Sequence, residues 1–432
     1  KMADVLGRAG AWCGQNKYLS AIKNAFQNFM PLTIAGAIGV LWCNVLVNDQ
    51  TGLGLFFKPI MALDFLNPAF QAVNFCTISC ITVGITLGIA QEIGIWNMGA
   101  EKAGYIPGLV GLAAWLSVTN TSHMVDGAKE AFTGVAGNEL GATGLFTGMI
   151  IGVLSVELFC FFEKQDALKI KMPEQVPPGV ARAFEVLVPA TITLIITACI
   201  GSACYNLTGL YLNDVIKNGI QGPLGAVGAT IPGVMIIYLV IMLFWLVGIH
   251  GNNMLSAVKE ALFTPLALEN VEAFNKGETP KNIINMYFLQ MCGEFGGSGV
   301  TIGLVIAIMI FGKREDNKAI ATLSLVPGLF NINETVTFGI PMVLNPILGI
   351  PFVVAPLVTI IIGYVLTVIG FCPVACLTVP WTTPPIVFGF LACGANVMGA
   401  VTQAILIVVS TVIYVPFLIS YEKYQNKQAA EA

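Results

Sequence analysis

Two ionisable residues could do chemistry inside stretches of sequence that are otherwise apolar. Glu334 follows two asparagines in NINETVTFGIPMVLNP, and no Lys or Arg lies near it in the chain. His250 lies between glycines in WLVGIHGNN. An ionised side chain at the centre of a bilayer is unfavourable by roughly 3 to 10 kcal/mol, so it marks a functional site by default. A carboxylate there can act as a general base, and an imidazole can share the hydrogen bond of a substrate hydroxyl.

Other charged residues in the same half of the chain allow more than one interpretation. Glu294, in MCGEFGGSG, can face a cavity, or it can cap a half-helix whose N-terminus gathers unpaired N–H groups. For the neighbouring pair Lys259 and Glu260 we expect a position at the membrane interface. His250 can also be a hydrogen-bonded structural residue.

Two tryptophans favour a sugar as the bound molecule. Trp245 precedes His250 by five residues, and Trp381 lies in the proline-broken stretch VPWTTPP. A sugar offers C–H faces that stack on indole rings and hydroxyls that hydrogen bond to amides and carboxylates. The alternative for each tryptophan is an ordinary position at the membrane interface. For Trp381 the prolines favour a place in a transport pathway.

The composition shows which scaffold must position these residues. Of the 432 residues, 56% are hydrophobic and 10% are charged, and the mean hydropathy is +0.82. Soluble domains carry about 25% charged residues, so this chain is built for lipid. The formal net charge of −4 comes without a basic stripe or an acidic tail, and nucleic acid is therefore not expected as a partner.

The cysteines do not indicate a metal site. Most of the 11 cysteines lie in apolar runs, where a thiol behaves as a small hydrophobic side chain. The pairs Cys76/Cys80 and Cys372/Cys376 are spaced by one helical turn, but neither has the histidines or the second cysteine pair of a zinc site. We expect neither a metal nor a cofactor.

The first half of the chain predicts five membrane spans. A helix needs about 20 apolar residues to cross the hydrocarbon core, and such runs occur at 26–47, 68–90, 104–119, 140–162 and 184–206. Segments 51–63 and 207–221 are expected to be interfacial amphipathic helices. The residues before the first run are polar and mixed in charge, so a cleavable leader is not expected.

The second half is less regular. Long apolar runs occur at 225–249, 282–311, 346–371 and 395–420, and the segments 250–268 and 319–344 between them are broken by Gly, Pro and Asn. Broken backbone survives at membrane depth only where protein or a water-filled cavity covers it, as in transport pathways. How these segments thread through the membrane stays open.

Basic residues close to the runs indicate the orientation. Lys and Arg accumulate on the cytoplasmic side, and they precede the first run, follow the fourth and occur near the C-terminus. The groups are Arg8, Lys17 and Lys23; Lys164, Lys169, Lys171 and Arg182; Lys313, Arg314 and Lys318; and Lys423 and Lys427. Both termini are therefore expected in the cytoplasm.

Several motifs in this chain resemble one family of transporters. The run NINETVTFGIPMVLNPILGIPFVVAP resembles the N-x-N-E-x-x-x-F-G-x-P-x-x-x-N-P stretch of enzyme IIC, the membrane component of the lactose/cellobiose/diacetylchitobiose class of the bacterial sugar phosphotransferase system. WLVGIHG, GGSGVTIGL, VPWTTP and AIKNAFQNFMPLTIAGA follow the same order. The resemblance covers about residues 20 to 420.

The resemblance implies a fold and a set of partners. The expected fold is an all-α polytopic protein of the bacterial inner membrane with about ten transmembrane helices, interfacial helices and two re-entrant hairpins. Residues 1–220 would be a scaffold and dimerisation domain, and residues 221–432 a sugar-binding transport domain that moves like an elevator. The protein would be a homodimer that carries one disaccharide per chain.

The resemblance also implies a reaction. A phosphocysteine on a separate enzyme IIB, with enzyme IIA upstream, would phosphorylate the C6 hydroxyl of the sugar. Because the chain ends soon after its last run, we expect enzyme IIB on another polypeptide. Whether this chain itself counts as an enzyme is left open, since the phosphoryl group comes from the partner.

The family's motifs assign roles to particular residues. Glu334 and His250 match the residues that contact the C6 hydroxyl, Trp381 matches the tryptophan near the sugar, and Asn333 matches the asparagine beside the glutamate. Asn252, Asn253 and Glu294 depart from the family's expected pattern. The predicted site comprises Glu334 and His250 as catalytic residues, and Asn331, Asn333, Trp381, Thr382, Asn253, Glu294, Ser298 and Trp245 as sugar-binding residues.

Two other classes of transporter were weighed against this interpretation. An ion-coupled secondary transporter also uses broken helices and buried carboxylates, with Glu334 or Glu294 binding a proton. A channel is disfavoured because the sequence has no repeated filter motif and no evident rings of charge. The identity of the disaccharide and the resting conformation do not follow from the sequence.

Overall fold

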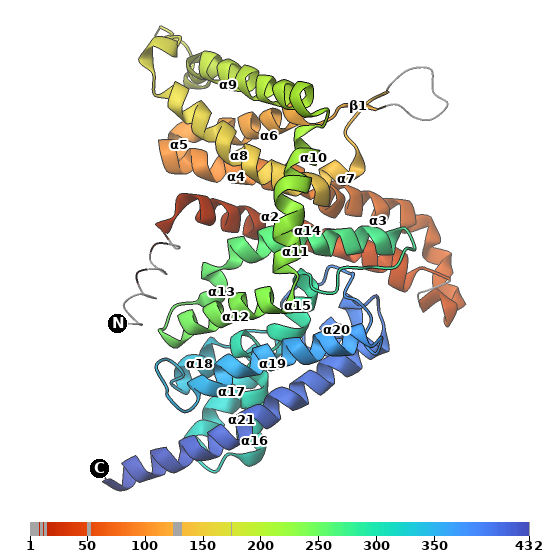
Figure 1. Cartoon of the computed structure of the whole chain (residues 1–432), viewed down its shortest axis with the longest axis vertical. Helices are drawn as coiled ribbons and strands as arrows, with labels where there is room; N and C mark the ends of the chain where they lie inside the picture. The colour runs from red at the N-terminus through yellow and green to blue at the C-terminus, as the bar shows by residue number, and fades with distance from the viewer. Residues whose placement is uncertain are drawn as a thin grey trace. The chain divides into compact units, whose positions relative to one another are not determined.

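The chain is almost entirely helical. The structure is a computed structural model that describes Arg8, Trp12 and residues 15–49, 53–123, 132–173 and 175–431. Among these residues the strands are the two-residue β1 (Ser122–His123) and β2 (Phe132–Thr133), which pair antiparallel (Figure 1). The predicted all-α fold is confirmed.

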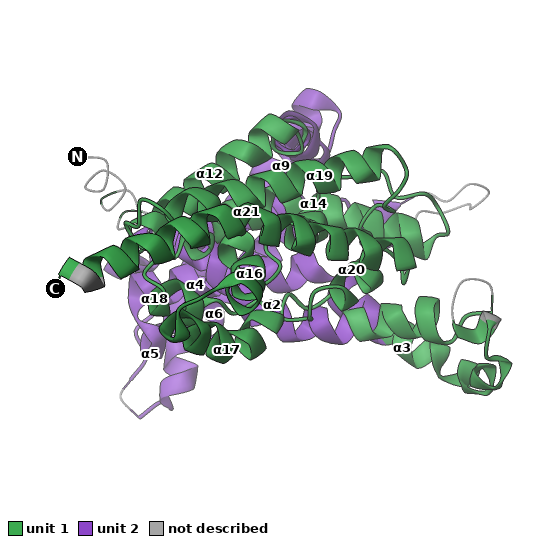
Figure 2. Cartoon of the chain, turned by 90° about the horizontal axis from the view of Figure 1, so that it is seen from below, with its two compact units in different colours: residues 1–14, 37–72, 226–432 green, residues 15–36, 73–225 purple. Residues whose placement is uncertain are grey.

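The helices form two compact units, shown in separate colours in Figure 2. Unit 1 contains residues 1–14, 37–72 and 226–432, and unit 2 contains residues 15–36 and 73–225. The chain passes from one unit to the other within α2 (Lys17–Leu41), α3 (Asn67–Asn74) and α11 (Gly222–Gly228).

Unit 2 is a bundle of apolar helices that pack through small residues. Its helices are α4 (Ile81–Met98), α5 (Ala100–Ala103), α6 (Ile106–Val118), α7 (Gly137–Leu140), α8 (Ala142–Glu163), α9 (Pro178–Thr208) and α10 (Leu212–Ile216). Helix α4 packs against both α6 and α8. A Cβ on Gly111 would lie 2.3 Å from Cβ of Ala90, and one on Gly148 would lie 2.2 Å from Oγ1 of Thr86. The glycines therefore let α6 and α8 approach α4 closely.

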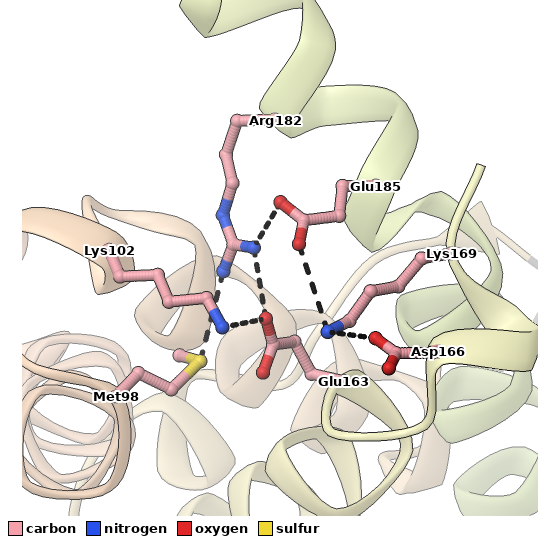
Figure 3. Close-up of polar contacts among 7 residues, drawn as sticks. All are labelled: Met98, Lys102, Glu163, Asp166, Lys169, Arg182 and Glu185. Carbon is pink, nitrogen blue, oxygen red and sulfur yellow. Dashed lines mark hydrogen bonds and ion pairs between the residues drawn. The ribbon is translucent and has the colours of Figure 1, made fainter. Parts of the chain in front are cut away.

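A charge network closes the α8–α9 end of unit 2 (Figure 3). Glu163 is 1% exposed, and its Oε1 lies 2.8 Å from Nζ of Lys102 and 3.0 Å from Nη1 of Arg182. Nη1 of Arg182 also lies 2.8 Å from Oε2 of Glu185. Two cations thus compensate the buried carboxylate, as a buried charge requires.

The connection between α8 and α9 carries the rest of this network. Nζ of Lys169 lies 3.2 Å from Oδ1 of Asp166 and 3.9 Å from Oε1 of Glu185. The hydrogen bond from Lys169 lowers the pKa of the Asp166 carboxyl below its ordinary value. Two of the basic residues that indicated the orientation, Lys169 and Arg182, are therefore engaged with acidic neighbours here.

Unit 1 carries the second half of the chain. Its helices are α12 (Ile231–Leu246), α13 (Gly251–Met254), α14 (Ser256–Asn275), α15 (Met286–Gly293), α16 (Ile302–Phe311), α17 (Glu315–Leu329), α18 (Glu334–Gly339), α19 (Gly349–Val368), α20 (Val387–Ala392) and α21 (Val397–Glu431). Helix α16 packs against α17 and α21, and α19 packs against α12, α15 and α21. These contacts bury one continuous apolar core.

Some helices can cross a membrane unbroken and others are bent. By length and composition, 5 helices of the described residues are long enough: Lys17–Leu46, Ala142–Glu163, Pro178–Thr208, Gly349–Val368 and Val397–Gln428. The number rises to 8 if three bent pairs each count as one span. The bent pairs are Lys58–Ser79 with Ile81–Met98, Leu212–Gly228 with Ile231–Leu246, and Met286–Val300 with Ile302–Phe311.

Three segments differ from their sequence-based prediction. The run 282–311 was expected to be continuous, but it bends by 59° at GGSG, because Gly296, Gly297 and Gly299 have φ values of +69°, +88° and +76°. Segment 51–63 was expected to be one amphipathic helix, and its described part contains the 3₁₀-helices Leu53–Leu55 and Lys58–Leu66 instead. Segment 250–268 was expected to be broken by Gly, Pro and Asn, and it is broken before Ser256, but Pro265 lies within the continuous helix α14.

We expect Gly299→Ala to destabilise unit 1 by more than backbone strain alone. Its φ of +76° disfavours any side chain, and a Cβ would lie 2.3 Å from Cδ2 of the buried Phe352. The left-handed backbone contributes about 1 to 2 kcal/mol, and the overpacking adds about 1 to 3 kcal/mol. Thermal unfolding of the detergent-purified protein measures the loss.

Gly370→Ala is the matched control for this substitution. Gly370 has nearly the same φ, +78°, but a Cβ there would meet nothing within 4 Å. Its unfolding temperature should fall only by the backbone contribution. Equal losses for Gly299→Ala and Gly370→Ala would show that the contact with Phe352 contributes nothing.

Candidate functional site

The structure brings the two predicted catalytic residues together. His250 follows α12, and Glu334 is the first residue of α18. Nε2 of His250 lies 3.8 Å from Oε1 of Glu334, and the two side chains are 37% and 48% exposed. Both can therefore meet a ligand and each other.

A backbone turn fixes the orientation of the imidazole ring. Gly248 has a φ of +81°, which turns the chain after α12 so that His250 becomes the N-cap of α13. Nδ1 of His250 accepts a hydrogen bond from the Asn253 N–H at 3.2 Å. Because Nδ1 is the acceptor, the proton of the neutral ring is on Nε2, the nitrogen that faces Glu334.

The gap between the two side chains suits a hydroxyl group. A separation of 3.8 Å is too long for a direct hydrogen bond, which needs about 2.7 to 3.2 Å. An oxygen placed beside both groups can instead accept from Nε2 of His250 and donate to Glu334. The geometry is that of a base and a donor that share one substrate hydroxyl.

Trp245 packs against the ring of His250. Trp245 is 2% exposed, and its ring centroid lies 4.4 Å from that of His250. Its other aromatic neighbour is Phe352, whose ring is nearly perpendicular to the indole, with the centroids 6.4 Å apart. Because Trp245 is buried and packs against the imidazole of His250, it can support that ring. Trp381, in contrast, is 44% exposed, so its indole is accessible for stacking.

The glycine-rich loop between α15 and α16 holds the residue before Glu334. Nδ2 of Asn333 donates to the carbonyl of Ser298 at 2.7 Å, and Asn333 is 4% exposed. A Cβ on Gly297 would lie 2.6 Å from Cβ of Asn333, so only a glycine lets the loop approach this closely. The side chain of Asn333 is therefore bonded to the backbone of Ser298, and this bond ties the glycine-rich loop to the residue before Glu334.

Asn331 joins the same loop to the segment that carries Trp381. The Gly296 N–H donates to Oδ1 of Asn331 at 2.6 Å. Nδ2 of Asn331 donates to the carbonyl of Trp381 and, at 3.1 Å, to the carbonyl of Thr383. Thr382 lies between these two carbonyls and is partly buried.

Known proteins resemble this chain over almost its whole length. The family model described as phosphotransferase system, EIIC, matches residues 23–356. The oligo-beta-mannoside-specific EIIC component of Bacillus subtilis (strain 168) is 34% identical over 94% of this chain and 90% of its own length. The cellobiose-specific EIIC component of Lactococcus lactis subsp. lactis (strain IL1403) is 30% identical over 99% of this chain and 98% of its own length.

A solved structure also resembles this one. The crystal structure of the transporter ChbC, the IIC component of the N,N′-diacetylchitobiose-specific phosphotransferase system, has a TM-score of 0.88 to this chain. It is 30% identical, and the similarity covers 97% of each chain.

The chain belongs to the EIIC family of the phosphotransferase system. The resemblance inferred from NINETVTFG, WLVGIHG, GGSGVTIGL and VPWTTP is thereby confirmed, including the lactose, cellobiose and diacetylchitobiose class. This EIIC is a multi-pass membrane component of a sugar-transporting phosphotransferase system, in which EIIC works with IIB and IIA components and a sugar.

Glu294 of this EIIC has a protein partner on each side. It forms an ion pair with Lys259 of α14, and Oε1 of Glu294 accepts a hydrogen bond from the hydroxyl of Tyr238 at 2.8 Å. The side chains of Lys259 and Glu294 are 7% and 17% exposed. Lys259 is thus buried against a carboxylate that compensates its charge, and its expected depth at the membrane interface stays a prediction.

Tyr238 is not among the residues predicted from the sequence, and Lys259 was expected at the membrane interface. A lysine in an apolar stretch of an EIIC is a signal for a buried counter-charge, and Glu294 is its partner here. Tyr238 gave no local signal, since it lies on the apolar helix α12. Asn253 is exposed and acts through its backbone, which donates to His250.

We expect Lys259→Met to lower the stability of this EIIC strongly. Removing one partner of a buried ion pair leaves an uncompensated charge, which typically destabilises by about 3 to 5 kcal/mol. The double variant Lys259→Met/Glu294→Gln should recover much of that loss, because no charge then stays buried. Thermal unfolding in detergent measures both.

Lys276→Met provides the control. Lys276 pairs with Glu272 one turn away on α14, and these side chains are 58% and 43% exposed. An exposed ion pair is screened by solvent and contributes little to stability, so this variant should unfold close to wild type. A Lys259→Met protein as stable as Lys276→Met would show that the buried pair is not needed for stability.

Proposed function

We propose that this EIIC carries a β-linked disaccharide across the bacterial inner membrane and presents its C6 hydroxyl for phosphorylation by phospho-EIIB. The observation that carries the proposal is the 3.8 Å pair of Glu334 and His250, which leaves room for one hydroxyl oxygen. The names of the relatives support a sugar of this kind: they are specific for oligo-beta-mannoside, cellobiose and N,N′-diacetylchitobiose. Cellobiose, diacetylchitobiose and lactose are the candidate sugars.

The proposed reaction is a phosphoryl transfer with Glu334 as base. Oxygen O6 of the sugar attacks the phosphorus of the phosphocysteine on EIIB, the O6–P bond forms, and the P–S bond breaks to leave the cysteine thiolate. The proton of O6 passes to Glu334. His250 donates through Nε2 and steadies O6 for in-line attack, which suits a transfer that depends on positioning and charge stabilisation.

Other site residues would bind the sugar around this hydroxyl. The accessible indole of Trp381 offers a stacking face for a pyranose ring. Thr382 is adjacent to it, and Asn333, Asn253, Ser298 and Glu294 remain proposed contacts or supports of the sugar. Trp245 would support the ring of His250, because Trp245 is buried against it.

The proposed movement is that of an elevator. We assign the scaffold and dimer interface to residues 1–220 and the sugar-carrying part to residues 221–432, with both termini in the cytoplasm. All the proposed site residues fall in 226–432, within a compact unit that also contains residues 1–14 and 37–72, and this grouping supports a part of the chain that carries the sugar as one body. The helix pair bent by 59° is typical of the re-entrant segments that line such pathways.

The second candidate is an ion-coupled sugar transporter. A half-exposed carboxylate such as Glu334 could bind a proton in each transport cycle. The two mechanisms differ in their product, because phosphorylation delivers sugar phosphate and needs phosphoenolpyruvate, whereas ion coupling delivers unchanged sugar and needs an ion gradient.

We expect Glu334→Gln to abolish sugar phosphorylation and to retain measurable sugar binding. Glutamine keeps the shape and the hydrogen bonding of the side chain but cannot accept the proton, and general bases contribute about 10² to 10⁴-fold to rate. Membrane vesicles with this protein receive phosphoenolpyruvate, the general phosphotransferase proteins, EIIA, EIIB and a panel of labelled disaccharides. Sugar phosphate and bound sugar are measured separately.

Glu278→Gln is the matched control, because Glu278 is exposed in the loop after α14 and is not among the proposed site residues. It should phosphorylate at the wild-type rate. A wild-type rate in Glu334→Gln would refute the assignment of Glu334 as base. Accumulation of unmodified sugar that follows a proton or sodium gradient would refute the proposed function and favour ion coupling.

A further inference from the structure

We propose that Asn331 is a positioning residue that sets the distance between Trp381 and Glu334, and is not itself a sugar ligand. The inference rests on the proposed function, because it concerns how the stacked sugar reaches the base. It replaces the sequence-based expectation that Asn331 binds the sugar directly.

The first observation is that protein groups already engage the amide of Asn331. Each of the two N–H bonds on Nδ2 has a carbonyl partner, Trp381 for one and Thr383 for the other. Oδ1 accepts the Gly296 N–H at 2.6 Å. An asparagine side chain has two N–H donors and a carbonyl oxygen with two lone pairs, so protein groups use both donors and one of the two lone pairs, and no donor is left for a sugar oxygen.

The second observation is that these bonds reach two segments distant in sequence. Gly296 belongs to the glycine-rich loop after α15, and Trp381 and Thr383 belong to the proline-broken segment before α20. Asn331 itself lies three residues before Glu334. One side chain therefore joins the base, the loop that holds Asn333 and the segment that holds the stacking indole.

The backbone of Asn331 supports this role. Its φ is +63°, in the left-handed region that asparagine tolerates better than most residues. This conformation turns the chain between α17 and α18. Both the backbone and the side chain of Asn331 are thus specific to this position.

The Trp381 segment is anchored independently at its other end. The carbonyl of Ala375 accepts from Nδ2 of Asn270 and from Nδ2 of Asn285, each at 3.0 Å. The hydroxyls of Tyr287 and Thr378 lie 2.5 Å apart. The root of the segment is therefore fixed to α14 and α15, and Asn331 fixes the part that carries the indole.

The consequence is a specific division of kinetic effects. Without the bonds from Asn331, Trp381 still has an anchored segment and can still stack on a sugar, so affinity should persist. The hydroxyl would no longer be held in register with Glu334, and a misplacement of about 1 Å can lower the rate of a positioned reaction by about 10²-fold.

The test is Asn331→Asp in vesicles with the complete phosphotransferase cascade. Aspartate keeps an acceptor for the Gly296 N–H but replaces both donors with oxygen, which repels the carbonyls of Trp381 and Thr383. We expect kcat for sugar phosphate to fall by about 10²-fold, while the Kd for sugar without EIIB changes less than about threefold.

Asn331→Gly is the second variant, and it keeps the test valid if the aspartate variant does not fold. Glycine suits a φ of +63° without strain and removes all three side-chain bonds. It should show the same loss in kcat with Kd retained. Asn396→Asp is the control: Oδ1 of Asn396 accepts the Met398 N–H at 2.9 Å, which aspartate can also do, so its kcat should equal wild type.

Two results would overturn the inference while the wild-type protein still makes sugar phosphate. A wild-type kcat in Asn331→Asp and Asn331→Gly would show that Asn331 does not position the reaction. A Kd raised about tenfold or more, with kcat at saturating sugar unchanged, would make Asn331 a sugar ligand. Absence of sugar phosphate with the wild-type protein would refute the proposed function, and this inference with it.

Discussion

A backbone that breaks inside a membrane must find its hydrogen bonds within the protein, and this constraint shapes unit 1. The hydrocarbon core contains no water that could hydrogen bond to a free N–H or C=O group. The glycine-rich loop after α15 meets the requirement through side-chain amides: Asn331 accepts the Gly296 N–H, and Asn333 donates to the Ser298 carbonyl. Two further buried hydroxyls, those of Ser410 and Tyr414, bond the carbonyls of Val300 and Gly299 from α21.

Buried charges, like the broken backbone, are compensated by groups of the protein itself. Glu294 and Lys259 compensate each other in unit 1, and Glu163 is compensated by Lys102 and Arg182 in unit 2. Glu334 differs from both carboxylates. Its ionisable neighbour is His250, at a distance too long for a direct hydrogen bond, so Glu334 keeps hydrogen-bonding capacity for a ligand where the other two carboxylates use theirs on the protein.

The sequence predicted the continuous helices well and the broken ones poorly, for a physical reason. Runs 140–162 and 184–206 correspond to α8 and α9, because an uninterrupted apolar run has one stable conformation in lipid. Run 282–311 looked equally continuous, since Gly and Ser are small enough to occur in membrane helices. The glycines of GGSG make the bend, but the groups that satisfy the broken backbone, on Asn331, Asn333 and α21, lie far along the chain and give no local signal.

The candidate site was predictable in part. His250 and Glu334 were found because an ionisable residue in an apolar stretch is conspicuous. The engagement of Asn331 was not predictable, because its partners are backbone groups of Gly296, Trp381 and Thr383, and a sequence does not show which carbonyls meet in space. Lys259 stood out as a charge in an apolar stretch, but the sequence does not show that its partner is Glu294, which lies at the end of another helix, α15.

The N-cap role of His250 limits the paths that a proton can take. With Nδ1 engaged by the Asn253 N–H, the ring can take up and release protons through Nε2 only, so it cannot pass them from one face to the other as a relay would. A proton removed from a sugar hydroxyl at this site would therefore pass to Glu334, which faces Nε2, and not through the imidazole to the side of the Asn253 N–H.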